Sequence, residues 1–166
     1  MKIYKVGYLI GSLSSTSINR KLARALVKLA PPSLQFADIL FKYLLILCDE
    51  FDADYPPVIP GGLINAIDWA SRPWGTNAFA HKPSTVIGAS PGAIGTAVAQ
   101  QSLRSVLGFL NSPQMSAPEG YIQFTPGLID DEGNVTVEST REFLRGYMQE
   151  FHDFIARVTA VLPPDS

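Results

Sequence analysis

The chain has 166 residues, of which 46% are hydrophobic and 17% are charged, and its formal net charge at pH 7 is −2. This length and composition indicate a single globular domain, residues 1–166, and exclude an intrinsically disordered chain. A small negative charge without a basic run argues against nucleic acid and anionic membranes as partners.

Cysteine and histidine are scarce. The single cysteine, Cys48, excludes an internal disulfide framework and is typical of a reducing compartment. Together with two histidines it supplies too few soft ligands for a zinc site, so we expect no metal. No apolar stretch is long enough for a membrane span, and the N-terminus lacks a signal-peptide pattern. We therefore expect a soluble, cytoplasmic protein.

Strand and helix patterns alternate along the chain. In chain order, we expect strands at residues 2–10, 34–41, 83–90 and 119–124, and helices at residues 18–30, 60–72, 94–110 and from 143 onward. A capping-box pattern, Ser139 to Glu142, precedes the last helix, whose seam is Phe143, Tyr147 and Phe151. This alternation predicts an α/β fold with a doubly wound, mainly parallel sheet in three α/β/α layers.

Two strand-to-helix turns belong at the carboxyl edge of this sheet, where such folds bind ligands. The first turn, residues 11–19, reads GSLSSTSIN and crowds hydroxyl groups at a helix N-terminus, which favours a phosphate. The second turn, residues 88–95, reads GASPGAIG, and its glycines allow a flat ring to approach the backbone. The alternatives are helix caps in a solvated loop for the first turn and glycines that serve packing for the second.

The second turn also fits the G-x-S-x-G pattern of a serine hydrolase. Ser90 would be the nucleophile, with Asp130 or Glu138 and then His152 completing the triad in the usual chain order. In that motif the residue after the nucleophile donates its backbone N–H to the oxyanion, and here that residue is Pro91, which has none. The hydrolase interpretation is therefore disfavoured.

Three other motifs fail as well. A dinucleotide fingerprint would need glycine at position 90, and a Walker loop would need Gly-Lys-Ser/Thr, which follows neither turn. A cysteine phosphatase would need an arginine where Asp54 stands, six residues after Cys48. A small buried thiol is the simpler interpretation of that cysteine.

Four segments resemble the NAD(P)H-dependent FMN reductase family of flavodoxin-like proteins, which includes quinone- and chromate-reducing members. They are GSLSSTSINRKLARAL, IPGGLINAIDWASRPWG, KPSTVIGASPGAIGTAVAQQSLRSVLGFLNSPQM and DDEGNVTVESTREFLRGYM. The resemblance implies a flavodoxin-like fold that binds FMN between the two turns. The residues it implies for the cofactor are Ser12, Ser17, Ile18 and Asn19 in the first turn, and Ser90, Pro91, Gly92 and Gly95 in the second. Many relatives carry an arginine where this chain has Ser14, so one phosphate contact is absent or replaced.

The activity implied by the resemblance is FMN-dependent oxidation of NADH or NADPH, with electrons passed to a quinone, a flavin or a similar small acceptor. The flavin carries this chemistry, so no catalytic side chain is assigned. The family's use of the region of Trp69 and Trp74 in subunit contacts implies a homodimer or homotetramer, whereas ordinary core packing is the alternative. A flavodoxin-like electron carrier without nicotinamide turnover and a non-catalytic remnant are the rival functions.

One departure from the family pattern lies between Val58 and Ile59. Relatives have a strand-plus-helix unit there, of roughly 30 residues, which would supply the central strand in the order 2-1-3-4-5. Either the apolar segment 40–49 becomes a strand and fills the gap, or the molecule carries residues that the printed sequence lacks. We favour the second alternative, which predicts a Val58–Ile59 Cα separation well beyond about 3.8 Å.

Overall fold

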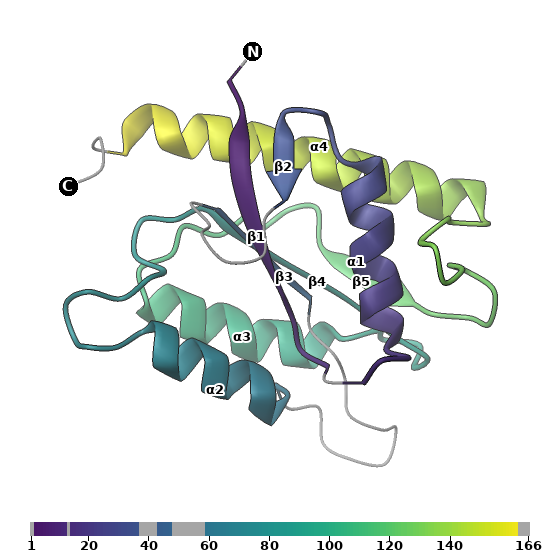
Figure 1. Ribbon diagram of the computed structural model, residues 1–166, viewed down its shortest axis with the longest axis horizontal. Coiled ribbons are helices and arrows are strands. Elements are labelled where there is room, and N and C mark those ends of the chain that lie inside the picture. The colour runs from purple at the N-terminus through teal and green to yellow at the C-terminus, as the bar shows by residue number, and fades with distance from the viewer. Residues whose placement is uncertain (1, 13, 37–42, 48–58, 163–166) are drawn as a thin grey trace.

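The computed structural model describes residues 2–12, 14–36, 43–47 and 59–162. Within these residues, five parallel strands form one sheet with helices on both faces (Figure 1). The strands are β1 Tyr4–Ile10, β2 Leu34–Phe36, β3 Tyr43–Leu47, β4 Ser84–Ser90 and β5 Gly120–Gln123, and the helices are α1 Ile18–Leu29, α2 Gly61–Ala70, α3 Ala97–Phe109 and α4 Glu138–Val161. The order β2-β1-β3-β4-β5 is flavodoxin-like and confirms the predicted fold.

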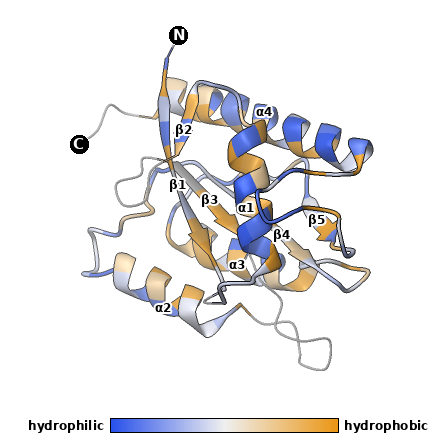
Figure 2. Ribbon diagram, turned by 45° about the vertical axis from the view of Figure 1, so that its right-hand side comes forward, coloured by the Kyte–Doolittle hydropathy of each residue, from blue (hydrophilic) through white to orange (hydrophobic). Residues whose placement is uncertain are grey.

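The molecule has three layers. Helices α1 and α4 cover one face of the sheet, and α2 and α3 cover the other (Figure 1). Side chains of β3 alternate between these faces: Leu45 and Leu47 belong to the core beneath α1 and α4, and Ile46 to the core beneath α2 and α3. The strands are mostly orange in the hydropathy view, whereas α1 and the N-terminal part of α4 carry long blue stretches (Figure 2). Burial on both faces explains why the strands are continuous apolar runs.

Strand β3 occupies the centre of the sheet, between β1 and β4. It is formed by Tyr43–Leu47, inside the segment 40–49, as the first alternative predicts, so the sheet has a central strand without the additional residues that we favoured. β3 provides the backbone partners of the neighbouring strands that would otherwise be unpaired. Val58 lies outside the described residues, so its separation from Ile59 stays a prediction.

The register of β1 with its two neighbours explains how so short a chain forms a continuous five-stranded sheet. Val6 pairs with Phe36 at the end of β2 and, on its other side, with Tyr43 at the start of β3. Phe36 and Tyr43 therefore lie at the same level of the sheet, two strand spacings or about 10 Å apart. The six residues between Phe36 and Tyr43 reach about 20 Å when extended. This stagger allows a connection half as long as a parallel crossover ordinarily needs.

Helix α4 begins earlier than the capping-box pattern predicted. Its N-cap is Val137, which makes no side-chain cap, and Ser139 lies inside the first turn. Arg141 stabilises this end instead, because its Nη2 donates to the Val135 carbonyl at 2.7 Å and its Nη1 pairs with Glu138. The capping-box prediction was therefore wrong. None of the helices in the described part of the chain is long and apolar enough to cross a membrane.

Tyr147 ties α4 to the middle of the sheet. The side chain is fully buried, and its hydroxyl donates to the Val86 carbonyl at 2.9 Å and lies 2.5 Å from Thr85 Oγ1. Burial raises the pKa of Tyr147 well above its ordinary value of 10.0. The folded state therefore favours the neutral phenol.

We predict that Tyr147→Phe lowers the free energy of unfolding by about 1–3 kcal/mol, because Thr85 and the Val86 carbonyl lose a buried partner. The wild-type contribution is fully present below about pH 10 and is lost as the pH rises above it, since ionisation opposes burial. Urea denaturation at neutral pH and at pH 10.5 measures both effects. The variant should show a smaller alkaline loss than the wild type. Equal stability of the two proteins at neutral pH would contradict the assignment.

Candidate functional site

The two predicted turns meet at the carboxyl edge of the sheet. Asn19, in the first turn of α1, joins them: its Nδ2 donates to the Ala89 carbonyl at 2.8 Å, and the Ala89 N–H donates to its Oδ1 at 2.8 Å. The Asn19 side chain is completely buried. Ala89 directly precedes Ser90, the last residue of β4. The structure thus brings together the two turns that the sequence assigned to one ligand.

Hydroxyl groups of the first turn form a connected rim. The Ser14 N–H donates to Ser12 Oγ at 3.2 Å, and Ser14 Oγ lies 3.0 Å from Thr16 Oγ1. Ser14 and Thr16 are exposed and Ser12 is half-buried. Ser17 is buried and caps α1, where its side chain accepts from the Arg20 N–H. The rim therefore offers neutral donors to solvent beside the positive end of a helix dipole.

Arg20 is a candidate site residue that the sequence analysis missed. Its Nε donates to the Ser14 carbonyl at 3.4 Å. This contact brings a guanidinium to the turn that carries the exposed hydroxyl groups. The signal was available in the sequence, because Arg20 stands within the first helical turn after the cap. Ile18 is half-buried and packs against the core beneath α1 and α4.

The second turn is held by its own serine. Ser90 is 4% exposed, and its Oγ accepts the Gly92 N–H at 3.0 Å. The Ser90 carbonyl accepts from the Phe124 N–H at 2.8 Å, which fixes the turn to the segment after β5. Pro91 is exposed and Gly92 is half-buried. The turn therefore exposes Pro91 and part of Gly92 to solvent, while the buried Ser90 side chain holds the backbone at Gly92.

Gly95 packs closely against a neighbouring strand. Its φ is +56°, and a Cβ there would lie 3.1 Å from the Ile122 nitrogen and 3.1 Å from the Tyr121 carbonyl carbon. Gly95 thus lies directly against the backbone of β5, where a side chain has no space. A contact of its backbone with the cofactor stays a prediction. Gly88 is likewise buried within β4, where it pairs with Tyr121.

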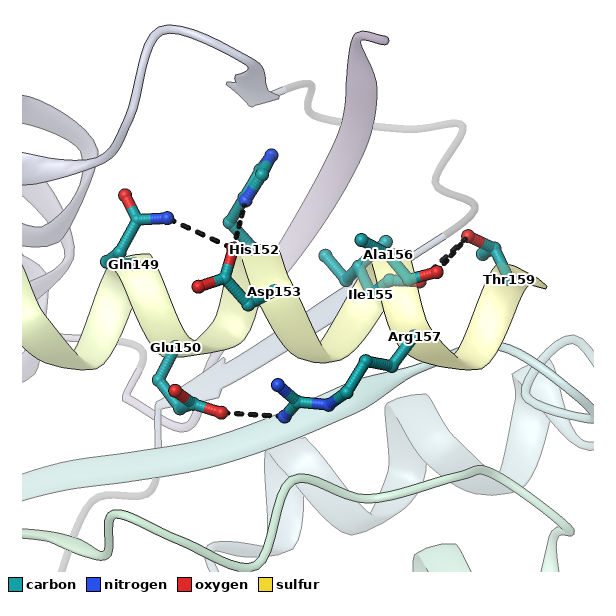
Figure 3. A network of polar contacts seen from close by, with 8 residues as sticks. All are labelled: Gln149, Glu150, His152, Asp153, Ile155, Ala156, Arg157 and Thr159. Carbon is teal, nitrogen blue, oxygen red and sulfur yellow. Dashed lines mark hydrogen bonds and ion pairs between the residues drawn. The ribbon is translucent and has the colours of Figure 1, made fainter. Parts of the chain in front are cut away.

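No hydrolase triad is assembled around Ser90. His152 Nδ1 lies 2.8 Å from Asp153 Oδ1 on α4, and this hydrogen bond lowers the pKa of Asp153 (Figure 3). The His152 ring also meets the Tyr4 ring edge-on at 5.4 Å. Tyr4 is the first residue of β1 and Ser90 is the last residue of β4. Since the strands are parallel, His152 lies near their amino ends and Ser90 at their carboxyl ends.

The acidic residues of the proposed triad have structural partners. Asp130 accepts the backbone N–H of Asn134 at 2.7 Å, which is the main reason that its pKa lies below the ordinary value. Glu138 pairs with Arg141. Within the described residues, no group of three or more histidine, cysteine, aspartate and glutamate side chains is arranged to hold a metal ion.

A surface hollow of about 350 Å³ lies along β5 and the start of α4. It is lined by Glu119, Tyr121, Ile122, Gln123, Ser139, Thr140 and Phe143. The Tyr121 hydroxyl donates to Glu119 Oε1 at 2.8 Å and accepts from Gln101 at 2.9 Å. None of the predicted site residues lines this hollow, so we assign the site to the two joined turns.

Comparison with known proteins identifies the family of this chain. The family model described as NADPH-dependent FMN reductase matches residues 55–126. A 2-hydroxy-1,4-benzoquinone reductase of Burkholderia sp is 37% identical over 171 aligned positions, covering 89% of this chain and 93% of the relative. A quinone reductase of Pseudomonas putida is 35% identical over 185 aligned positions, covering 96% of this chain and 99% of the relative.

Among solved structures, FerB, a flavoenzyme NAD(P)H:(acceptor) oxidoreductase from Paracoccus denitrificans, superimposes with a TM-score of 0.85 at 34% identity, covering 93% of this chain and 98% of FerB. The strand order and the joined turns define the flavodoxin-like class of α/β proteins. Within that class, the chain belongs to the NAD(P)H-dependent FMN reductase family.

The alignments with relatives also test whether this chain lacks residues that the family has. The alignment with the Pseudomonas putida enzyme has 185 positions, whereas this chain has 166 residues, so the relative contains residues without a counterpart here. A shortfall against the family is therefore confirmed. Its place between Val58 and Ile59 stays a prediction.

We predict that Gly95→Ala destabilises the protein by about 1–3 kcal/mol, because a left-handed backbone and a close strand both oppose a Cβ. Gly61→Ala is the matched control, since Gly61 begins α2 and no atom lies within 4 Å of a Cβ placed there. The control should keep or slightly raise stability. Urea denaturation compares the two variants, and equal effects would show that β5 does not constrain the second turn.

Proposed function

We propose that the chain, acting as one FMN-binding domain, binds FMN across the two joined turns and works as an FMN-dependent NAD(P)H oxidoreductase. Electrons would pass to a quinone, a flavin or a similar small acceptor. Membership of a reductase family supports the activity. The observation that carries the binding mode is the pair of hydrogen bonds between Asn19 and Ala89, because they place both turns within reach of one molecule.

The residues present fit the two halves of FMN. In the first turn, Ser12, Ser14 and Thr16 offer hydroxyl donors and Arg20 adds a positive charge, which together suit a phosphate monoester. In the second turn, exposed Pro91 and the residues beside it provide a surface without long side chains, which suits a flat ring. The first turn is thus polar and suits the phosphate, whereas the second turn carries short side chains and suits the ring.

Bound FMN would supply a ring that accepts hydride from NAD(P)H and then reduces the acceptor. The protein's part is to hold the phosphate at the first turn and to cover one ring face with the second turn. Hydride transfer needs no general acid or base from the chain, and the described residues of the two turns include no carboxylate or imidazole. Dependence on NAD(P)H supports a cytoplasmic place of action.

The test is an anaerobic titration. Purified protein incubated with FMN should retain it on desalting, show a bound-flavin absorption spectrum, lose its visible band on addition of NADPH, and recover it with a stoichiometric amount of benzoquinone. A protein that binds FMN but is not reduced by NADPH or NADH would instead be an electron carrier. A protein that retains no FMN would refute the proposal and favour the non-catalytic remnant.

We further propose a homodimer that uses the face formed by α2 and α3. Trp69 and Trp74 are each 78% exposed and Phe109 is 73% exposed, so core packing of the tryptophans was the wrong alternative. The rings of Trp74 and Phe109 are 6.1 Å apart beside a hollow of about 380 Å³ between the two helices. Exposed apolar groups on this scale mark interaction surfaces.

We predict that Trp69→Arg shifts the protein to monomer, because a charge at the centre of an apolar interface is costly to desolvate. Sedimentation equilibrium of the FMN-loaded protein measures the change. Val161→Arg is the control, since Val161 is 83% exposed at the end of α4, on the other face of the sheet. A monomeric wild type, or a dimeric Trp69→Arg variant, would contradict this interface.

A further inference from the structure

Strand β4 leads into the second turn at the carboxyl edge of the sheet. Its pairing with β3 includes Ile87 opposite Leu47, the last described residue of β3, and β4 then continues for three residues to Ser90. In a parallel sheet, successive residues direct their backbone groups alternately to the two neighbouring strands. The Ser90 carbonyl bonds to Phe124 on the β5 side, so Ala89, one residue earlier, directs its N–H and C=O to the opposite side, that of β3.

Asn19 binds the Ala89 backbone groups on that side. Its carboxamide accepts from the Ala89 N–H and donates to the Ala89 carbonyl, both at 2.8 Å, as a peptide group of a neighbouring strand would. Both Asn19 and the backbone groups it binds are buried, so loss of the carboxamide leaves a donor and an acceptor without partners. The helix that follows the first turn thereby fixes the backbone that leads into the second turn.

We infer that Asn19 is a positioning residue for the flavin ring: it holds Ser90, Pro91 and Gly92 at a set place relative to the first turn, and its side chain does not bind the phosphate. This inference rests on the proposed binding of FMN across the two turns. It differs from the direct cofactor contact that the family resemblance implied for Asn19, because the side chain is 0% exposed and both of its polar atoms bond to the Ala89 backbone.

Comparing FMN with riboflavin distinguishes a residue that positions the ring from one that binds the phosphate, since riboflavin lacks the phosphate. Quenching of flavin fluorescence gives the affinities of the wild type, Asn19→Ala and Asn19→Ser for both ligands. We expect both affinities to fall by the same factor, about tenfold or more, so that their ratio stays within about twofold of the wild-type ratio. Asn19→Ser leaves room for a bridging water and keeps the test available should Asn19→Ala not fold.

Arg20→Gln is the contrasting variant. Arg20 contacts the first turn through Ser14, so we expect this change to weaken FMN about tenfold and to leave riboflavin unaffected. Tyr147→Phe controls for general loss of stability, because Tyr147 binds β4 at Thr85 and Val86, away from both turns. It should keep both affinities. At saturating FMN, the visible spectrum should change in the Asn19 variants and not in Tyr147→Phe.

The outcomes are distinct. A loss in the Asn19 variants that falls on FMN alone, as in Arg20→Gln, would overturn the inference and restore a phosphate contact. Unchanged affinities for both flavins, or a bound-flavin spectrum identical to the wild type, would overturn it as well. A wild-type protein that binds neither flavin would instead refute the proposed function, on which the inference depends.

Discussion

The structure depends on the two hydrogen bonds between the Asn19 carboxamide and the Ala89 backbone. Strands β1 and β4 are not neighbours, since β3 lies between them, and a side chain of α1 binds the backbone of β4 directly. Buried peptide groups must be paired, because water cannot reach them and the low dielectric makes an unmet bond costly. A side chain from α1 meets this requirement and in doing so fixes the distance between the two turns.

The need to pair buried peptide groups also explains why the sheet has a central strand although the chain is shorter than its relatives. β2 and β3 pair with successive parts of β1, and Val6 is the residue at which one ends and the other begins. This stagger lets a short connection place β3 in the centre, where both of its neighbours need backbone partners. Without it, β1 and β4 would each present an unpaired edge within the core.

The turns divide the proposed ligand into a charged and a flat half, and the protein treats the halves differently. The first turn offers exposed hydroxyl groups and one guanidinium, all of which can adjust to an anion. The second turn is supported from below by Ser90 and by the close approach of Gly95 to β5, so its backbone is held in place. Rigid support under the ring and adaptable donors around the phosphate suit a cofactor that carries out the chemistry itself.

The sequence by itself determined the layered α/β fold and the edge at which the two turns lie, because these follow from local periodicity and from the geometry of parallel strands. The strand order was implied by the family resemblance. The sequence also excluded a hydrolase, since Pro91 lacks the necessary N–H. Only the tertiary structure decided which segment became the central strand, that Asn19 binds backbone, and that Arg20 reaches the first turn. Those outcomes depend on register and on the pairing of buried groups between distant segments, which no local pattern encodes.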